Sequence, residues 1–179
     1  MPNKSYSIEH NNISDILHWI DKGTIGIPEM QRPFVWSTTQ VRDLIDSLYR
    51  GYPIGFIVTW QNPDASLKMG GKGQNKEIII DGQQRITALS AALMGKEIVD
   101  DKYLKKRIYI SFNPITEEFA TRSAAIAKDP KWIPDISIFS QPNFDEFEYV
   151  VNNSERLGLP GNELNKIIQK VKSISEAEI

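Results

Sequence analysis

Residues 77–93, EIIIDGQQRITALSAAL, join a run of β-branched residues directly to a helical pattern. Ile78, Ile79 and Ile80 favour a strand, because β-branched side chains pack well on a pleated sheet. The apolar residues that follow recur at helical spacing and end at a typical stop; they are Ile86, Leu89, Leu93 and Met94, with Gly95 behind them. The sequence therefore predicts a strand that turns abruptly, through the segment DGQQR, into a helix.

The DGQQR turn, residues 81–85, has the composition of an anion-binding site. The first amides of a helix lack intrahelical partners and lie at the positive end of its dipole, so phosphate binds there readily. Gly82 permits a sharp turn and a close approach of the ligand, and Arg85 offers a planar fork of donors. Further polar groups come from Gln83, Gln84 and Thr87.

Asp81 does not suit a bare phosphate, because its carboxylate repels the anion. It fits if a divalent cation bridges it to phosphate, or if it accepts hydrogen bonds from a ribose or a base. A simpler interpretation makes Asp81 the helix cap, Gly82 a relaxed turn and Arg85 a solvated surface residue. The residues alone leave both interpretations open.

A second polar cluster lies in EMQRPFVW, residues 29–36. Gln31 and Arg32 stand between apolar residues and a proline, where an unpaired buried charge is unfavourable. In the functional interpretation Arg32 reaches the same anion as Arg85, and Trp36 is a wall or a stacking surface for a base. In the alternative, Arg32 pairs with Glu29 or a carbonyl, and Trp36 belongs to the core.

Other local patterns predict the remaining elements. Residues 37–40, STTQ, have the form of a capping box, and a helical stripe follows them as far as Gly51. We also expect the following elements: a helix over 13–20 with Ser14 as its N-cap, a buried strand at 56–60, a surface loop at 61–76, a hairpin over 107–123, and helices at 144–151 and 162–174.

Composition limits the functional classes. The chain has 179 residues, no cysteine and a net charge of −2, so disulfides, thiolate zinc sites, a cysteine nucleophile and broad non-specific DNA binding are not expected. A local basic groove remains compatible with this charge. The polar start has no secretory h-region, and no apolar run approaches the ~20 residues of a membrane span. We expect a cytoplasmic protein without a membrane partner.

The C-terminal part changes character to helical. We therefore expect two domains, a DGQQR-bearing domain over 1–142 and a helical extension over 143–179. The chain stops soon after its last helix without a glycine cap, which indicates the start of a further region absent from this chain. A homo-oligomer is compatible with the exposed face expected of that helix.

Residues 27–60, IPEMQRPFVWSTTQVRDLIDSLYRGYPIGFIVTW, followed by IIIDGQQRITAL at 78–89, resemble the N-terminal domain of GmrSD-type, modification-dependent restriction enzymes. The resemblance covers residues 10–95 well. It implies an α+β fold of the ParB/sulfiredoxin type, namely a small mixed β-sheet with flanking helices, here with a C-terminal helical extension. A sulfiredoxin-type reaction is excluded, because it needs a cysteine nucleophile.

The resemblance implies a function and a set of site residues. It implies binding and hydrolysis of a nucleoside triphosphate with Mg²⁺, in a restriction or anti-phage system whose DNA is cut by a separate nuclease domain or subunit. Carried over by position, the expected catalytic residues are Asp81, Gln84 and Arg85, with Asp81 also the metal ligand. The expected nucleotide-binding residues are Gly82, Gln83 and Thr87, with Gln31, Arg32 and Trp36. No histidine follows His18, so the histidine-metal type of nuclease has no general base in this chain.

Two alternatives stay open. One is a module that binds nucleotide or modified DNA without turnover, which the basic stretches at 68–76 and 102–107 favour. The other is a purely structural or regulatory domain, since a helix cap resembles an anion site.

Overall fold

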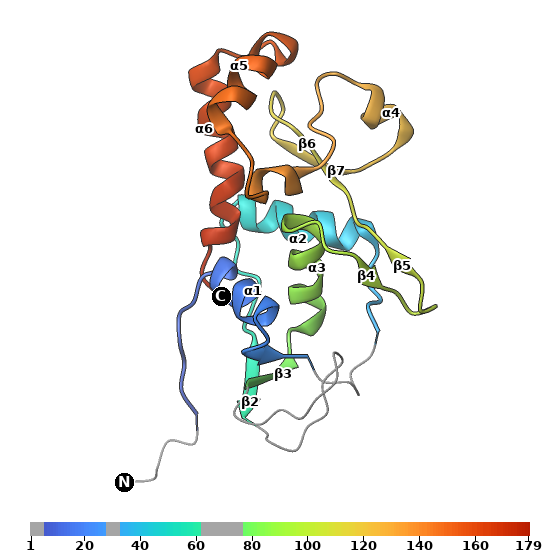
Figure 1. Cartoon of the computed structure of the whole chain (residues 1–179), viewed down its shortest axis with the longest axis vertical. Coiled ribbons are helices and arrows are strands. Elements are labelled where there is room, and N and C mark those ends of the chain that lie inside the picture. Colours follow the sequence, from blue (N-terminus) through green and yellow to red (C-terminus); the bar gives the residue numbers. More distant parts are fainter. Residues whose placement is uncertain (1–5, 28–32, 62–76) are drawn as a thin grey trace.

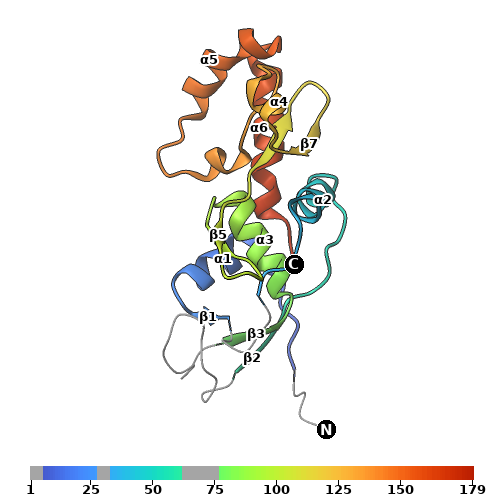
Figure 2. The same cartoon turned by 90° about the vertical axis from the view of Figure 1, so that its right-hand side faces the viewer.

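The computed structural model describes residues 6–27, 33–61 and 77–179. The molecule is elongated, with a small sheet toward one end and the C-terminal helices toward the other (Figures 1 and 2). Helices α2 (Thr38–Tyr49) and α3 (Gln83–Leu93) occupy the middle. The predicted class, a small mixed sheet with flanking helices and a helical C-terminal part, is confirmed.

The central strand of the sheet lies at the start of residues 77–93. β3 (Glu77–Asp81) lies between β1 (Ile25–Gly26), which runs parallel to it, and β2 (Val58–Gln61), which runs antiparallel. Trp60 pairs with Ile78, and the register shifts between Val58 and Thr59. β1 pairs only with Glu77 and Ile78, whereas β2 pairs along β3 as far as Asp81, so β2 holds the carboxyl end of β3 and the turn into α3.

β2 corrects the expectation of a buried strand at 56–60. It is an edge strand of this sheet, and the side chains of Val58 and Trp60 are 42% and 57% exposed. Alternate side chains of a strand face opposite sides. The side that carries Ile79 faces the core and is buried, while on the opposite side Ile78 is buried and Ile80 is exposed.

The helix starts follow local signals. Ser37 caps α2, accepting a hydrogen bond from the Gln40 amide while the Gln40 side chain accepts from the Ser37 amide, so the predicted capping box is confirmed. Ser14 does not cap α1 (Ile13–Asp21). Asn12 occupies the N-cap position, because the helix begins at Ile13, before Ser14. The Ile13 amide donates to the Ala177 carbonyl.

Helix α3 is the central helix of the core. The predicted inward residues Ile86, Leu89 and Leu93 are buried, and the small residues of its other faces are fully buried as well. It contacts α1, α2 and the 3-10 helix η1 (Ile136–Ser140). A helix enclosed on nearly all sides fixes its own amino terminus, and with it the position of the DGQQR turn.

Two ribbons extend the fold. β6 (Ile110–Asn113) and β7 (Glu118–Thr121) form the predicted hairpin, and Phe112 and Phe119 pack with Tyr49 of α2 at ring-centroid distances of 4.7 to 5.6 Å. The second ribbon pairs β4 (Ile98–Val99) with β5 (Lys105–Lys106). It projects from the side of the molecule (Figure 1).

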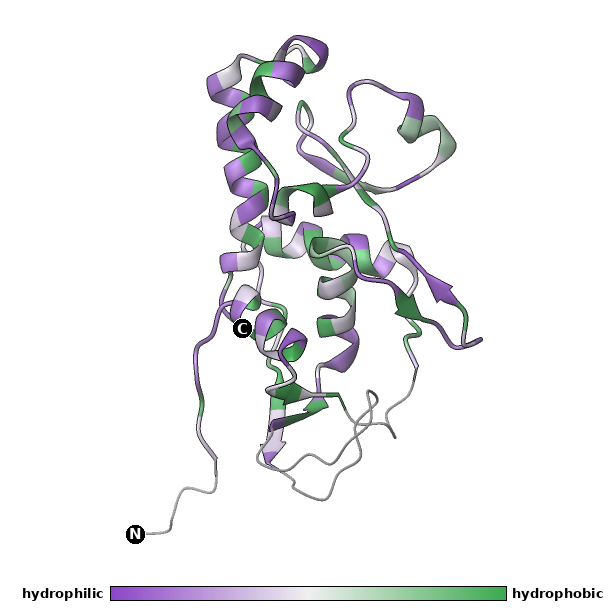
Figure 3. Cartoon of the chain, viewed as in Figure 1, coloured by the Kyte–Doolittle hydropathy of each residue, from purple (hydrophilic) through white to green (hydrophobic). Residues whose placement is uncertain are grey.

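The C-terminal helices share the main core. After α4 (Ala124–Lys128) and η1, helix α5 (Glu146–Leu157) packs on α6 (Gly161–Lys172), and η2 (Ser173–Glu176) packs on α1. The predicted inward face of α6 is buried: Leu164, Ile167, Ile168 and Val171. Figure 3 shows its alternation of hydrophobic and hydrophilic faces. The core thus runs across position 142, and the boundary proposed there stays a prediction. In the described ranges, no helix has the length and hydrophobicity needed to cross a membrane.

Glu117 ties the hairpin to α2 and α6 and yields a pH prediction. Its carboxylate accepts from the Lys170 ammonium at 2.7 Å and from the Tyr49 hydroxyl at 2.6 Å. The Lys170 bond, and then the Tyr49 bond, lower the pKa of Glu117 below its ordinary value of 4.5. A carboxyl with a depressed folded-state pKa stabilises the protein above its unfolded pKa and loses that contribution as pH falls through the folded pKa.

We therefore expect Glu117→Gln to lower the free energy of unfolding at neutral pH by roughly 1 kcal/mol or less, since both ionic partners are partly exposed. The difference from wild type should vanish at acid pH, below about 4. Thermal denaturation from neutral to acid pH measures it. Glu155→Gln, at an exposed position, is the matched control, and a difference that persists unchanged into acid would contradict the assignment.

Candidate functional site

The turn between β3 and α3 requires glycine. Gly82 is the N-cap of α3 with φ +90°, and a Cβ there would lie 2.3 Å from the Ile57 Cδ1 atom. Positive φ and this contact together exclude other residues without a shift of the chain. No side chain caps α3. Asp81 remains the last residue of β3, so the interpretation of Asp81 as helix cap is wrong.

The amino terminus of α3 keeps its first amides available. The intrahelical ladder starts with the bond from the Ile86 amide to the Gly82 carbonyl, 3.1 Å long. Within the part of the chain that the structure describes, the amides of Gln83, Gln84 and Arg85 have no acceptor. They lie at a depression of about 350 Å³ lined by Trp36, Ile80 and residues 81–85. The arrangement places uncompensated donors and the positive helix end at one concave surface.

Gln83 adds a polar side chain to this depression. The residue is 7% exposed and lines the depression, and its carboxamide has no hydrogen-bond partner among the described residues. The carboxamide is not a buried unsatisfied group, since among the described residues only Arg42 Nε is one. It therefore faces the open space of the depression, where a ligand can bond to it without displacing a protein partner.

Gln84, although adjacent, serves the fold. Its Oε1 accepts from the Val35 amide at 3.0 Å, and its Nε2 donates to the Pro33 carbonyl at 3.1 Å. Both ends of the carboxamide are therefore used by the segment 33–35. This pair of bonds holds the segment that precedes Trp36 against the start of α3, and so places Trp36 at the rim of the depression.

Arg85 is also committed to backbone carbonyls. Its guanidinium donates to the carbonyl of Ile54 at 2.5 Å and to that of Phe56 at 2.7 Å, and it contacts the Asp81 carboxylate at 3.3 Å. Its side chain is only 18% exposed. Arg85 is thus neither a solvated surface residue nor a free cation: it fastens the loop before β2 to the DGQQR turn.

Gly55 allows this close approach. It has φ +87°, and a Cβ there would lie 2.6 Å from an Arg85 guanidinium nitrogen. Local sequence patterns did not single out Gly55 or the carbonyls on either side of it. The signal available was the glycine directly after Pro53 and Ile54 in YPIGF, which marks a left-handed turn without naming its partner.

Asp81 is the acidic group of the site. Its side chain is 73% exposed beside Arg85. Across the described ranges, no three acidic or histidine side chains gather closely enough to hold a metal ion by themselves. Mg²⁺ usually takes one or two carboxylates and fills its shell with phosphate oxygens and water, so a lone exposed aspartate suits Mg²⁺ that arrives with a nucleotide.

Of the other expected site residues, one lines the depression, one does not, and two lie outside the described residues. Trp36 lines the depression and also packs against the core, and its role as a wall or stacking surface for a base stays a prediction. Thr87 is half-buried one turn into α3 and does not line the depression. Gln31 and Arg32, like the basic stretch at 68–76, lie outside the described residues.

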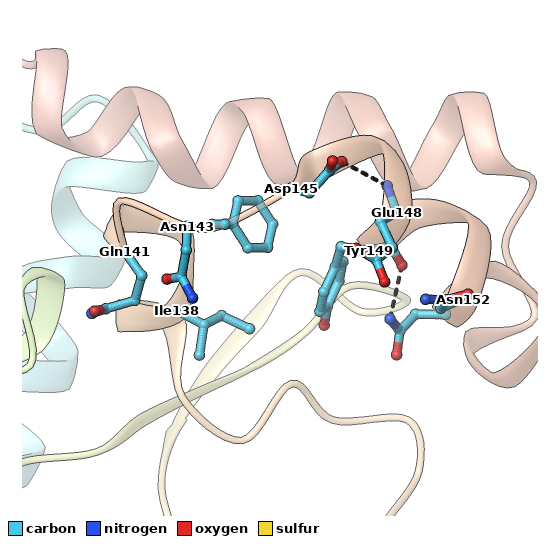
Figure 4. Close-up of a pocket in the computed structure, with 9 residues that line it drawn as sticks. Ile138, Gln141, Asn143, Asp145, Glu148, Tyr149 and Asn152 are labelled. Atoms are coloured by element: carbon cyan, nitrogen blue, oxygen red, sulfur yellow. Dashed lines mark hydrogen bonds between the residues drawn. The ribbon is translucent and has the colours of Figure 1, made fainter.

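A second depression, of about 320 Å³, lies beside α5 (Figure 4). Figure 4 shows Gln141, Asn143 and Asn152 around it, together with two acids. Asp145 caps α5 by accepting from the Glu148 amide, so that helix end is already neutralised. The carboxylates would repel an anion, and this surface is therefore unsuited to phosphate.

Two comparisons relate the chain to known proteins. The chain matches the family described as GmrSD restriction endonuclease, N-terminal domain, over residues 13–177. It is also 27% identical, over 139 residues, to an uncharacterized protein of Methanocaldococcus jannaschii. That alignment covers 69% of this chain and 24% of the archaeal protein, so the chain spans about a quarter of this relative's length. The likeness to the ParB/sulfiredoxin superfamily stays a prediction.

The bonds of Arg85 predict a stability effect that needs no ligand. Arg85→Ala should lower the free energy of unfolding by about 2–4 kcal/mol, because the Ile54 and Phe56 carbonyls lose a charged donor. Arg50→Ala is the control, since Arg50 is exposed and paired with Asp46 within one helix, and should cost less than ~1 kcal/mol. Urea denaturation of both variants measures the difference. Equal small losses would contradict the structural role of Arg85.

Proposed function

The chain belongs to the family of N-terminal domains of GmrSD restriction endonucleases, and we propose that it binds a nucleoside triphosphate at the amino terminus of α3. The observation that carries the proposal is the uncapped helix end at the depression, beside the Gln83 carboxamide, which has no hydrogen-bond partner among the described residues. In the proposal, the protein serves a restriction or anti-phage system, and a nuclease in another domain or subunit cuts the DNA.

The phosphates are held mainly by main-chain groups in this proposal. The amides of residues 83–85 donate to phosphate oxygens, and the helix dipole favours the negative charge. Gln83 supplies a neutral donor at the depression that no described residue of the protein occupies. Gly82 lets the phosphate approach the main chain, and Trp36 forms the side wall on which a base could stack.

Arg85 and Gln84 act as positioning residues. Because their polar groups already bond to main-chain atoms of residues 33–35 and 54–56, they preorganise the site and leave phosphate contact to the helix end. Preorganised donors in a fixed frame bind without losing energy to rearrangement. This assignment replaces the expectation that the Arg85 guanidinium grips the anion.

Asp81 carries the proposed hydrolytic role. Mg²⁺, when bound with the nucleotide, would neutralise phosphate charge and polarise the phosphoryl group. Asp81 is the exposed carboxylate at the depression, so it can hold the ion's hydration shell or orient the attacking water. It is held near the phosphate site by its place at the end of β3.

A second candidate function is nucleotide binding without turnover. Among the described residues, those lining the depression include a single carboxylate, Asp81, and no histidine, lysine or second acid that could act as a general base. Such a site would use the nucleotide as a conformational signal for the rest of the enzyme. Phosphate release by the isolated chain separates the two functions.

The ligand test uses a variant that keeps the fold. Gln83→Met has nearly the same volume and removes a carboxamide that makes no hydrogen bond with the described residues, so the unliganded melting temperature should change little. A nucleoside triphosphate with Mg²⁺ at ~100 times its dissociation constant should add about 2.7 kcal/mol to wild-type stability. Gln83→Met should lose most of that gain in a thermal-shift assay with each of the four ribonucleoside triphosphates.

Gln61→Met is the matched control, because Gln61 is an exposed glutamine at the opposite end of the same sheet. It should keep the full ligand response. No response of the wild type to any triphosphate, or the same response in both variants, would refute a nucleotide site at the end of α3.

Asp81→Asn tests the hydrolytic role. It should abolish Mg²⁺-dependent phosphate release while binding of the metal-free triphosphate stays equal or becomes tighter, because a repelling charge is removed. Phosphate release and thermal shift without Mg²⁺ are the two measurements, and Asp15→Asn on α1 is the control. Hydrolysis at the wild-type rate in Asp81→Asn would exclude this role.

A further inference from the structure

A rigid tip closes the β4–β5 ribbon and exposes an aromatic side chain. Tyr103 has φ +59° and is 83% exposed, and its neighbour Leu104 is 60% exposed. Asp100 holds the tip: its carboxylate accepts from the amides of Lys102 and Leu104, both at 3.0 Å, and its carbonyl accepts from the Tyr103 amide. The turn bonds hold the left-handed backbone conformation at Tyr103, so its side chain leaves the tip toward solvent.

Cations surround this tip. Residues 100–109 contain four, at Lys102, Lys105, Lys106 and Arg107, against two carboxylates. In the described part of the chain, Lys102 and Lys105 have no ion-pair partner, and Lys106 reaches the Asp100 carboxylate only at 3.9 Å. Figure 3 shows β5 as hydrophilic and its partner β4 as hydrophobic. The ribbon is therefore basic on the strand that follows the tip.

The basic surface continues along the extended chain toward β6. Arg107 and Arg122 both lie over the ring of Tyr109, with guanidinium carbons 5.1 and 4.9 Å from the ring centroid. Arg107 is anchored by Asp135 at 3.0 Å. For Arg122 the described residues offer no carboxylate partner, and its side chain is exposed. The intervening Ile108 points into the core, 2% exposed, so the polar side chains share the outer side.

We propose that the β4–β5 ribbon and the adjoining Tyr109–Arg122 surface form a contact for the DNA on which the complete enzyme acts, with Lys105 and Arg122 on backbone phosphates and Tyr103 against a base. A row of unpaired cations with interleaved aromatic rings suits a phosphate backbone. An exposed, preoriented tyrosine is suited to stacking on an unpaired or distorted base, because every base offers a π-face. The guanidinium over Tyr109 offers the planar donors that phosphate favours.

This surface is distinct from the proposed nucleotide site, because none of its side chains lines the depression at α3. One link between them is at the base of the ribbon, where Asp100 forms a β-bridge with Phe34, next to the Val35 amide held by Gln84. A variant of the ribbon can therefore lose DNA binding while it keeps the nucleotide response. DNA rather than a lipid surface is favoured by the family to which the chain belongs.

The test measures binding of the chain to a fluorescently labelled DNA duplex by anisotropy, with salt varied between about 50 mM and 200 mM. The double variant Lys105→Gln/Arg122→Gln should bind more weakly, and its slope of log affinity against log salt should be smaller by about 2, one for each phosphate contact. The control, Lys22→Gln/Lys166→Gln, neutralises two exposed lysines elsewhere and should match wild type.

Tyr103→Ala should weaken binding to single-stranded DNA by roughly tenfold, while Tyr103→Phe should keep it, because the ring does the stacking. Tyr6→Ala, which removes another exposed tyrosine, is the control. All ribbon variants should keep the wild-type thermal shift with triphosphate, so a failed nucleotide site and a failed DNA surface give different results.

Three outcomes would overturn the proposal. These are no measurable DNA binding by the wild-type chain at low salt, identical affinity and salt slope in the two double variants, and sedimentation with phosphatidylserine vesicles that only the ribbon variants lose while their DNA binding stays intact.

Discussion

The structure around the candidate site depends on one half-buried guanidinium, that of Arg85. Arg85 bonds to the carbonyls of Ile54 and Phe56, and the Gln84 carboxamide bonds to the Pro33 carbonyl and the Val35 amide. Two segments far apart in the sequence, 33–35 and 54–56, are thereby held against the first turn of α3. Removal of the Arg85 side chain takes the charged donor from two carbonyls at once. The glycines at 55 and 82 supply the room that this arrangement needs.

This constraint changes how a motif such as DGQQR is interpreted. Arg85 and Gln84 look like ligand-binding groups, but here they hold neighbouring segments of the chain in place. In our proposal, the main-chain amides of α3 and the Gln83 side chain form the binding surface. A variant that removes a frame residue would lose ligand affinity and stability together. Loss of binding in Arg85→Ala therefore does not by itself identify a phosphate contact. The same frame reaches the β4–β5 ribbon through the bridge of Phe34 with Asp100, so the two proposed ligand surfaces are built on one connected set of main-chain contacts.

Local signals predicted much of the fold. The capping box before α2, the helical stripes of α2, α3 and α6, and the strand-glycine-helix junction all follow from residues within a few positions of each other, and the structure contains them. The partners of Gln84 and Arg85 lie 29 to 51 residues away and are main-chain atoms, so no side-chain pattern announces them. For the same reason the exposure of β2 was not foreseen: it follows from strand order in the sheet, not from the apolar run itself. The burial of Gln83 also depends on packing, because it arises from the enclosure of α3.

The most direct test of the account is to map the nucleotide on the ¹H–¹⁵N spectrum of the assigned chain, with Mg²⁺ and a non-hydrolysable triphosphate. The account predicts that the largest shifts occur at the main-chain amides of Gln83, Gln84 and Arg85 and at the side-chain amide of Gln83. The side-chain resonances of Gln84 and Arg85, which stay bonded to carbonyls and an amide of the frame, should move little. Dominant shifts at the Arg85 guanidinium, or at the carboxamides beside α5, with the α3 amides unmoved, would contradict the account.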